Sequence, residues 1–259
     1  MHAYDEQRYV AGDTAFLVLY GWFFYFSKYY FCAVNDLLHN PVFHALSTGD
    51  KHLSFGTDMV KYFAAEVSPY AGFPEDHQLG FAELYSLLPA GRRILYAKPT
   101  PIEIPNGWQL QHEIKGLQFV YEAGKNVEAD FSAIVPLTTK DVDAMIELVK
   151  LTKPGPFDQR TIEFGSYYGI FINNKLAAIT GQRLHVEQYT EISAVCTHPT
   201  HTGKGYASVL LQHQLQLIIN KAQIPFLHVR ADNERAIALY ERLGFRQSRS
   251  MYFYFLKRS

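Results

Sequence analysis

Two glycines stand where a predicted strand becomes a predicted helix. Gly203 and Gly205 flank Lys204 in the stretch CTHPTHTGKGYASVLL, residues 196–211, which runs into an apolar, helix-like segment. Glycine costs backbone entropy there and adds no packing, which indicates a need for bare backbone. Because the first amides of a helix lack partners and glycine lets an anion approach them, the stretch predicts a phosphate-binding loop. The alternative is a turn that serves packing alone.

The composition is that of an ordinary globular chain. Its 259 residues are 48% hydrophobic with a net charge of -1, enough for one large domain or two ordinary ones. No basic surplus points to nucleic acid as a partner. Only Cys32 and Cys196 occur, so a disulfide framework is not expected and a reducing cytoplasm is the expected compartment.

One aromatic-rich N-terminal segment, residues 1–35, departs from this pattern. Residues 14–34 hold a single charge, Lys28, over a length that could span a bilayer. Tyrosines lie in its middle, and the flank before it is acidic, unlike a signal peptide or a positive-inside anchor. Three interpretations of the segment therefore stay open: a buried or partner-covered element, a membrane anchor, or a stretch outside the functional protein. Membrane attachment is disfavoured.

The rest of the chain predicts two α/β parts joined by a polar linker at 123–130. In the first part, residues 36–125, the patterns predict a helix at 81–88 and strands at 92–98, 108–114 and 117–122. In the second, residues 131–259, the predicted strands are 131–137, 167–184 as a hairpin around Asn173 and Asn174, 189–197, 226–231 and 251–256. Its predicted helices are 138–151, 207–222 and 233–243, the last closed by Gly244. This order predicts a mixed α/β domain around one sheet.

Two common phosphate-binding motifs do not match the glycine loop. The dinucleotide fingerprint requires a third small position that is Ser208 here, and no strand-turn-helix with a following acidic residue opens the domain. The ATP-type loop requires Ser or Thr after its lysine, whereas Gly205 follows Lys204.

The glycine loop and a second stretch, HVRADNERAIALYERLGFR at 228–246, together resemble the GNAT superfamily of acyl-coenzyme A-dependent N-acetyltransferases. The resemblance covers about residues 131–256 in matching element order. In the family loop, Q/R-x-x-G-x-G/A, Gly203 and Gly205 match, but Thr200 takes the Q/R place and Thr202 stands where arginine often precedes the first glycine. The resemblance implies a mixed, mostly antiparallel GNAT-type sheet flanked by helices.

The resemblance also implies acetyl-CoA as cofactor, with CoA as product, and the residues that hold it. The pantetheine arm would pair with the strand at Val195 and Thr197, and Asn233 would cap the next helix and contact the cofactor. The diphosphate would lie on the amides of the loop, with Lys204 as its cation; the loop residues are Thr202, Gly203, Lys204, Gly205, Tyr206 and Ala207.

Two catalytic residues are expected. Tyr240 matches the family tyrosine that protonates the departing thiolate; the alternative is a tyrosine that packs on the sheet. Glu191, which alternation places on one strand face with Ser193, Val195 and Thr197, is the expected base. The alternative for Glu191 is a solvated or salt-bridged glutamate.

Neither Cys196 nor the loop histidines predict a further centre. Cys196 has no matched His–Asp set and is interpreted as a small buried thiol. His198 and His201 alone are too few ligands for a metal site, so no metal is expected.

The predicted function is transfer of an acetyl group from acetyl-CoA to a primary amine of a small molecule or amino acid, by direct attack without a covalent enzyme intermediate. The alternative is a non-catalytic acyl-CoA sensor or interaction module. A homodimer is left open. Residues 36–125 resemble the same fold faintly and are interpreted as a degenerate copy, as in glycine N-acyltransferase-like tandem proteins. Without a glycine loop, this part is expected to shape the acceptor pocket.

Overall fold

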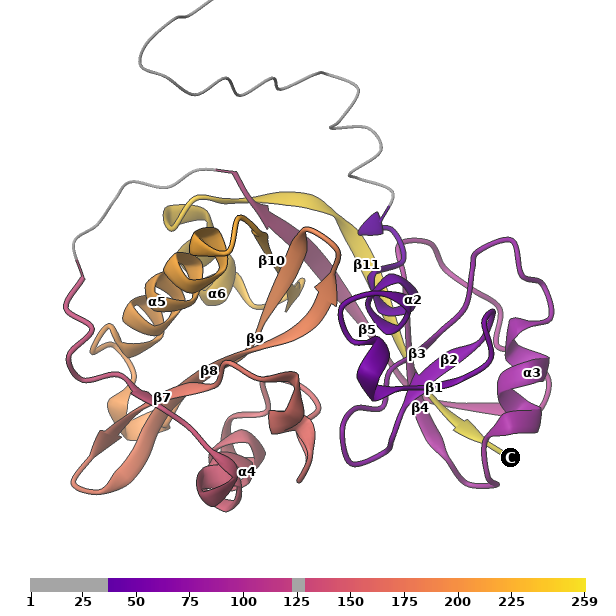
Figure 1. Cartoon of the computed structure of the whole chain (residues 1–259), viewed down its shortest axis with the longest axis horizontal. Coiled ribbons are helices and arrows are strands. Elements are labelled where there is room, and N and C mark those ends of the chain that lie inside the picture. The colour runs from indigo at the N-terminus through magenta and orange to yellow at the C-terminus, as the bar shows by residue number, and fades with distance from the viewer. Residues whose placement is uncertain (1–36, 123–128) are drawn as a thin grey trace, which may run out of the picture.

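The computed structural model describes residues 37–122 and 129–259, so the aromatic segment 14–34 lies outside the described residues. An eight-stranded sheet forms the centre, in the order β4-β11-β5-β10-β9-β8-β7-β6 (Figure 1). Only β9 and β10 pair in parallel among these strands, which confirms a mixed, mostly antiparallel sheet. The strands are β4 Arg93–Lys98, β5 Trp108–Tyr121, β6 Val135–Pro136, β7 Tyr168–Ile172, β8 Lys175–Val186, β9 Tyr189–Thr197, β10 Ile224–Arg230 and β11 Phe245–Arg258.

Helices cover both faces of this sheet. Successive side chains of β10 point to opposite faces. Phe226 belongs to the apolar core with α2 (Pro41–Ser47) and α4 (Val142–Thr152), and Leu227 to the core with α5 (Tyr206–Asn220) and α6 (Glu234–Arg242). In Figure 1, α5 and α6 accordingly lie together, away from α4. No helix in the described ranges is long and apolar enough to cross a membrane.

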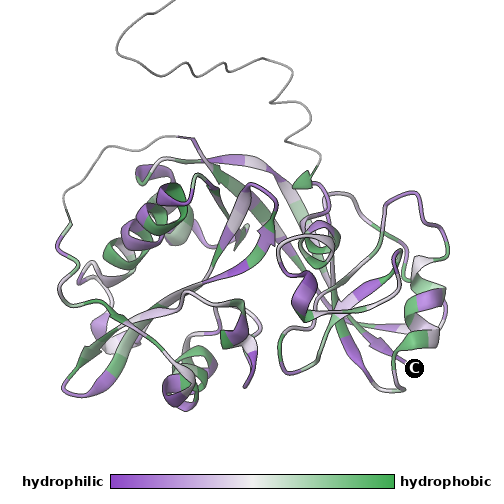
Figure 2. Cartoon of the chain, in the orientation of Figure 1, coloured by the Kyte–Doolittle hydropathy of each residue, from purple (hydrophilic) through white to green (hydrophobic). Residues whose placement is uncertain are grey.

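The sequence of α5 explains why it lies on the sheet. Leu210, Leu211, Leu215 and Ile218 recur at helical spacing and are buried together with Gln214. The exposed residues of the helix are Gln216, Ile219 and Asn220. Figure 2 shows this mixture of apolar and polar residues along the helix. Short 3-10 turns connect the larger elements: Lys51–Leu53, Thr139–Asp141, Thr161–Phe164 and Pro199–His201.

A smaller sheet and one helix pack at the β4 edge. The strands are β1 (Ser54–Gly56), β2 (Lys61–Phe63) and β3 (Ala71–Gly72), and the helix is α3 (Gly80–Leu87). The predicted halves 36–125 and 131–259 share the large sheet, because β4 and β5 lie beside β11 and β5 also pairs with β10. The division into domains, and the idea of a degenerate copy, stay predictions.

Two local predictions can be compared with the structure. Asn173 and Asn174 have φ of 49° and 59°, so the hairpin turn between β7 and β8 is confirmed. The two strands predicted at 108–122 are one, β5, which is a correction. Gly116 does not interrupt it; a Cβ there would lie 2.7 Å from the Phe253 ring and 3.0 Å from the Val229 carbonyl oxygen, so glycine serves close packing.

Candidate active site

The two parallel strands at the centre of the sheet separate partway along their length. Their pairing ends at Phe226 and Glu191, although β9 continues to Thr197 and β10 to Arg230. The backbone groups that face each other beyond this point are therefore not paired between the two strands. Such a gap is a place where an extended ligand can lie along a strand.

A bulge in β9 accompanies the separation. Cys196 pairs with Ile179 and Ser193 with Gly181, so β9 has one extra residue, and Ala194 has a φ of 54°. The strict alternation expected from Glu191 to Thr197 is therefore wrong. Because of the bulge, the side chains after Ala194 no longer alternate in step with Glu191. An alternating pattern in the sequence does not reveal such an extra residue.

A cavity of about 1000 Å³ opens at this gap. Its walls include Ser193, Val195 and Thr197 from β9, and His228 and Val229 from β10. Because neighbouring residues of β10 point to opposite faces, His228 and Val229 place the cavity on both faces of the sheet. The gap thus joins the side covered by α5 and α6 to the side covered by α2 and α4.

The glycine loop forms one end of the cavity. Gly203 and Gly205 have φ of 81° and 84°, and a Cβ at either position would meet no atom within 4 Å. Packing alone therefore does not explain these glycines. Gly205 is the N-cap of α5 and makes no side-chain cap hydrogen bond, so the first amides of the helix face the loop without a capping side chain. A diphosphate fits this arrangement of backbone and open space.

The structure brings most of the predicted cofactor residues to this cavity, but not Lys204. The predicted residues that line it are Val195, Thr197, Thr202, Gly203, Gly205, Tyr206, Ala207 and Asn233. Asn233 also caps α6, since its Oδ1 accepts a hydrogen bond from the Ala236 amide at 3.2 Å. The Lys204 Nζ lies 3.3 Å from Nδ1 of His201, and Lys204 is not among the lining residues.

Two arginines that the sequence analysis missed also line the cavity. Arg235 and Arg242 lie on α6 with a spacing of seven residues, which places them near one face of the helix. Their seven-residue spacing is the feature of the sequence from which a pair of cations on one helix face could have been predicted. These two arginines line the cavity, whereas Lys204 does not.

Tyr240 lines the cavity from α6. It belongs to the apolar core with Leu227 and Phe245, and only 7% of its surface is exposed. Burial raises the pKa of Tyr240 to about 12, so the phenol holds its proton at neutral pH.

Glu191 lies on the opposite face in a buried ion pair. Arg183 donates from Nε at 2.8 Å and from Nη2 at 2.6 Å, and Nδ1 of His228 lies 2.7 Å away. Burial alone would raise the pKa of Glu191, but Arg183 and the hydrogen bonds hold it below the usual range. A carboxylate so committed is a poor base, which favours the salt-bridged alternative.

These residues form part of a polar row across four adjacent strands. Arg183 is on β8, Glu191 on β9, His228 on β10 and Gln118 on β5. Gln118 Nε2 lies 3.0 Å from His228 Nε2 and donates to the Leu38 carbonyl at 2.9 Å. Both nitrogens of His228 therefore have protein partners, and the row ties the strands together where β9 and β10 begin to separate.

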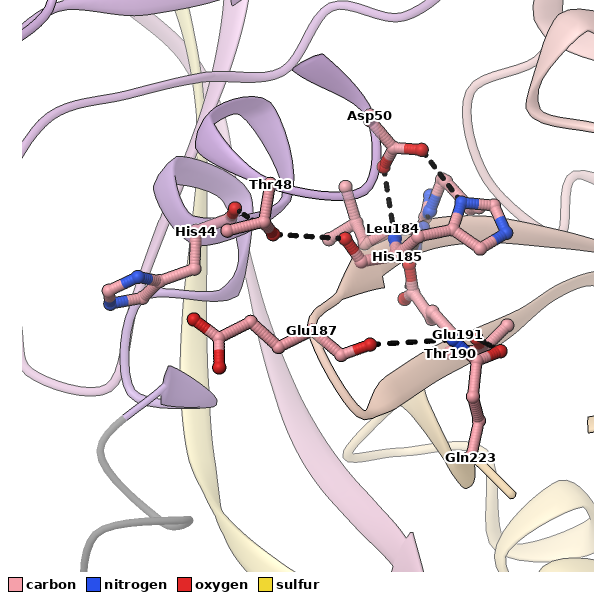
Figure 3. A network of polar contacts seen from close by, with 10 residues as sticks. His44, Thr48, Asp50, Leu184, His185, Glu187, Thr190, Glu191 and Gln223 are labelled. Atoms are coloured by element: carbon pink, nitrogen blue, oxygen red, sulfur yellow. Dashed lines mark hydrogen bonds and ion pairs between the residues drawn. The ribbon is translucent and has the colours of Figure 1, made fainter. Parts of the chain in front are cut away.

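A second polar network attaches the first described segment to β8 (Figure 3). Asp50 accepts from the His185 amide at 2.9 Å and lies 2.7 Å from its Nδ1. Thr48 donates to the carbonyl oxygen of His44 at 2.6 Å. The contacts fix the segment around α2 over the same sheet face as Arg183, so residues far apart in the chain are held together on this face.

Cys196 is buried in this structure. Burial raises the pKa of its thiol to about 11, which keeps it protonated. This agrees with a small buried thiol rather than a nucleophile. His198 and His201 lie in the turn after β9, where His198 Nδ1 is 2.8 Å from the Thr200 hydroxyl.

Comparison with known proteins gives consistent matches. Residues 167–254 match the family model described as FR47-like protein. A solved structure from Novosphingobium aromaticivorans, assigned to the GNAT family of acetyltransferases, is 31% identical with a TM-score of 0.80 and covers 86% of this chain and 98% of its own. The alanine N-acetyltransferase of ribosomal protein bS18 from Salmonella typhimurium is 28% identical over 119 residues, 43% of this chain and 79% of the relative. A GCN5-related N-acetyltransferase from Kribbella flavida shares the fold, at 11% identity and a TM-score of 0.57, covering 84% of this chain and 95% of its own.

Proposed function

Because the chain belongs to the GNAT family of acetyltransferases, we propose that it moves the acetyl group of acetyl-CoA to a primary amine of a small molecule or amino acid by direct attack. The observation that supports this most is the single cavity that runs from the glycine loop through the gap between β9 and β10 to the opposite face. Such a cavity admits a thioester from one face and an amine from the other.

The residues present fit the cofactor that the family uses. The amides after Gly203 and Gly205 would hold the diphosphate, with Arg235 and Arg242 beside it. The backbone at Val195 and Thr197, which β10 does not pair, would hold the pantetheine arm in the manner of an added strand. Bound acetyl-CoA supplies the reactive acetyl thioester.

Tyr240 is the proposed acid. As the new C–N bond forms and the C–S bond breaks, the sulfur takes the electron pair of the bond that breaks. The Tyr240 hydroxyl donates its proton to that sulfur. The attacking nitrogen releases one proton to solvent as the amide forms, and the Tyr240 phenolate takes one up from solvent, so the number of protons balances. Its burial, which keeps the phenol protonated before the reaction, supports this role.

The described part of the chain supplies no obvious strong base. Glu191 is held by Arg183 and His228, and both nitrogens of His228 are engaged. We assign Glu191 a positioning role at the strand gap. The cavity is lined by cationic side chains, which favour the neutral amine over its ammonium form. The nucleophile is then the amine that binds without its extra proton.

The test is release of free thiol from acetyl-CoA with a panel of amines and amino acids. Calorimetry with acetyl-CoA is run on the same protein. The proposal predicts binding together with amine-dependent thiol release. Binding without release under any amine would favour the non-catalytic sensor, and no binding at millimolar ligand would contradict the cofactor site.

A further inference from the structure

The charge of the cavity bears on the acceptor. Among the described residues that line it, none is Asp or Glu, whereas Lys and Arg occur on several elements: Lys153, Arg183, Arg230, Arg235 and Arg242. Arg230 is paired with Asp232 at 2.7 Å, and Glu191 is neutralised by Arg183. An acceptor with several ammonium groups would find cations and no carboxylate, so the lining disfavours polyamines.

The floor on the Arg183 face is apolar. Phe253 and Phe255 of β11 lie beside Ile114 of β5 and Leu95 of β4, in the register Phe253 with Ile114 and Phe255 with Leu95. All four line the cavity. Because they share one face of adjacent strands, they form a continuous surface suited to an aliphatic or aromatic group.

Arg183 lies where this floor meets the strand gap. Its Nε and Nη2 are bonded to Glu191, and its guanidinium carbon lies 4.9 Å from the centre of the Tyr70 ring. These contacts fix the orientation of the guanidinium. Nη1 has no hydrogen-bond partner among the described residues, and Arg183 lines the cavity. A fixed guanidinium with free N–H donors is a site for a carboxylate.

We propose that the acceptor is an amino acid with an apolar side chain, whose carboxylate binds Nη1 of Arg183 and whose side chain lies on Leu95, Ile114, Phe253 and Phe255. This assignment rests on the proposed function and names its substrate class. The carboxylate and the amine of an α-amino acid are separated by one carbon, so an acid held at Arg183 places the amine near the gap between β9 and β10.

The first experiment compares L-leucine and L-phenylalanine with leucinamide, phenylalaninamide and spermidine in the thiol-release assay. One charge-assisted hydrogen bond predicts a kcat/KM about tenfold or more higher for each acid than for its amide. Equal values for acid and amide, or spermidine as the best acceptor, would overturn the assignment.

A binding experiment separates this inference from the proposed function. In the presence of CoA, calorimetry should show N-acetyl-L-leucine binding about tenfold or more tighter than N-acetyl-L-leucinamide, whether or not any amine is turned over. Thiol release that fails for every amine would contradict the proposed function alone. Equal binding of the two N-acetyl compounds would contradict the acceptor assignment alone.

A matched pair of variants locates the preference. Arg183→Lys keeps the charge but loses the planar fork, so the ratio of acid to amide should fall toward one. Arg160→Lys is the control, because Arg160 also makes two hydrogen bonds to a glutamate, Glu163 at 2.6 and 2.9 Å, but lies outside the cavity. An unchanged ratio in folded Arg183→Lys would overturn the assignment; if that variant does not fold, the comparison of acid with amide in the parent protein decides.

Discussion

Tyr240 and Arg183 line one cavity from opposite faces of the eight-stranded sheet. Tyr240 belongs to the apolar core with Leu227 under α5 and α6, while Arg183 packs on Tyr70 in the core under α2 and α4. The gap between β9 and β10 connects the two sides. In the proposed reaction, Tyr240 protonates the leaving sulfur on one side of the sheet, and Arg183 holds the carboxylate of the acceptor on the other side.

Tyr240→Phe tests the acid. The ring and its packing are kept, so the free energy of unfolding should change little. The hydroxyl acts only in the transition state, so kcat should fall on the order of 10²-fold while the affinity for CoA stays nearly constant. Tyr96→Phe is the control, because Tyr96 is also buried but lies outside the cavity. A parent-like kcat for Tyr240→Phe, where chemistry limits the rate, would remove the acid role.

Gly205→Ala tests the phosphate loop. Its Cβ would project into open space beside the first amides of α5, so CoA should bind roughly tenfold or more weakly through the loss of charge-assisted hydrogen bonds. Lys204→Ala should cost less, because Lys204 does not line the cavity.

Gly165→Ala is the matched control for backbone strain. Gly165 has a φ of 87°, close to the 84° of Gly205, and a Cβ there also meets no atom within 4 Å, but it lies outside the cavity. Both variants should lose similar stability, measured by denaturant unfolding. Unchanged CoA affinity in Gly205→Ala, or an equal loss in Gly165→Ala, would argue against the loop as the phosphate site.

Glu191→Gln tests the buried ion pair through the pH dependence of stability. The pKa of Glu191 is lowered in the folded state from its ordinary value of 4.5, so its stabilising effect is full above pH 4.5 and is lost as the pH falls further. The variant should lose about 3–5 kcal/mol near neutral pH, because Arg183 is left without its partner. The difference from the parent should shrink below pH 4.5.

Glu163→Gln is the control for that experiment, since Glu163 pairs with Arg160 near the surface. Its free energy of unfolding should change little at any pH. A loss in Glu191→Gln that is equally small would mean that the row across the strands contributes little to holding the gap.

Much of the architecture follows from local sequence patterns. The turn at Asn173 and Asn174, the helix after Gly205 and the cap at Asn233 each depend on residues a few positions apart. The bulge at Ala194 and the pairing of Glu191 with Arg183 and His228 do not. They depend on which strands become neighbours, and that is decided by the packing of the whole sheet.

The proposed acceptor side was the least predictable part of the cavity. Its floor combines Leu95, Ile114 and Phe253 from strands far apart in the chain, and none of these residue types indicates a ligand by itself. Arg183 had no motif around it. By contrast, the proposed cofactor side has a signal in the sequence, because a glycine loop and the following helix are contiguous.

The absence of a strong base in the described lining predicts a characteristic pH profile. The kcat/KM for the acceptor should rise with pH until the acceptor amine is neutral, and the profile should move with the amine pKa when acceptors are exchanged. His201 also lines the cavity, and its pKa is lowered by desolvation and by the charges of Lys204 and His198. A profile that is the same for all acceptors but moves in His201→Gln would assign the base to that histidine instead.

The most direct test of the account is the initial-rate pattern when acetyl-CoA and the acceptor are both varied. If the thioester and the amine occupy the two sides of the cavity at once, the double-reciprocal lines for different acceptor concentrations intersect. Transfer through an acetylated side chain such as Cys196 would release CoA before the amine binds and would give parallel lines. Intersecting lines are the predicted result, and parallel lines would contradict direct attack across the gap between β9 and β10.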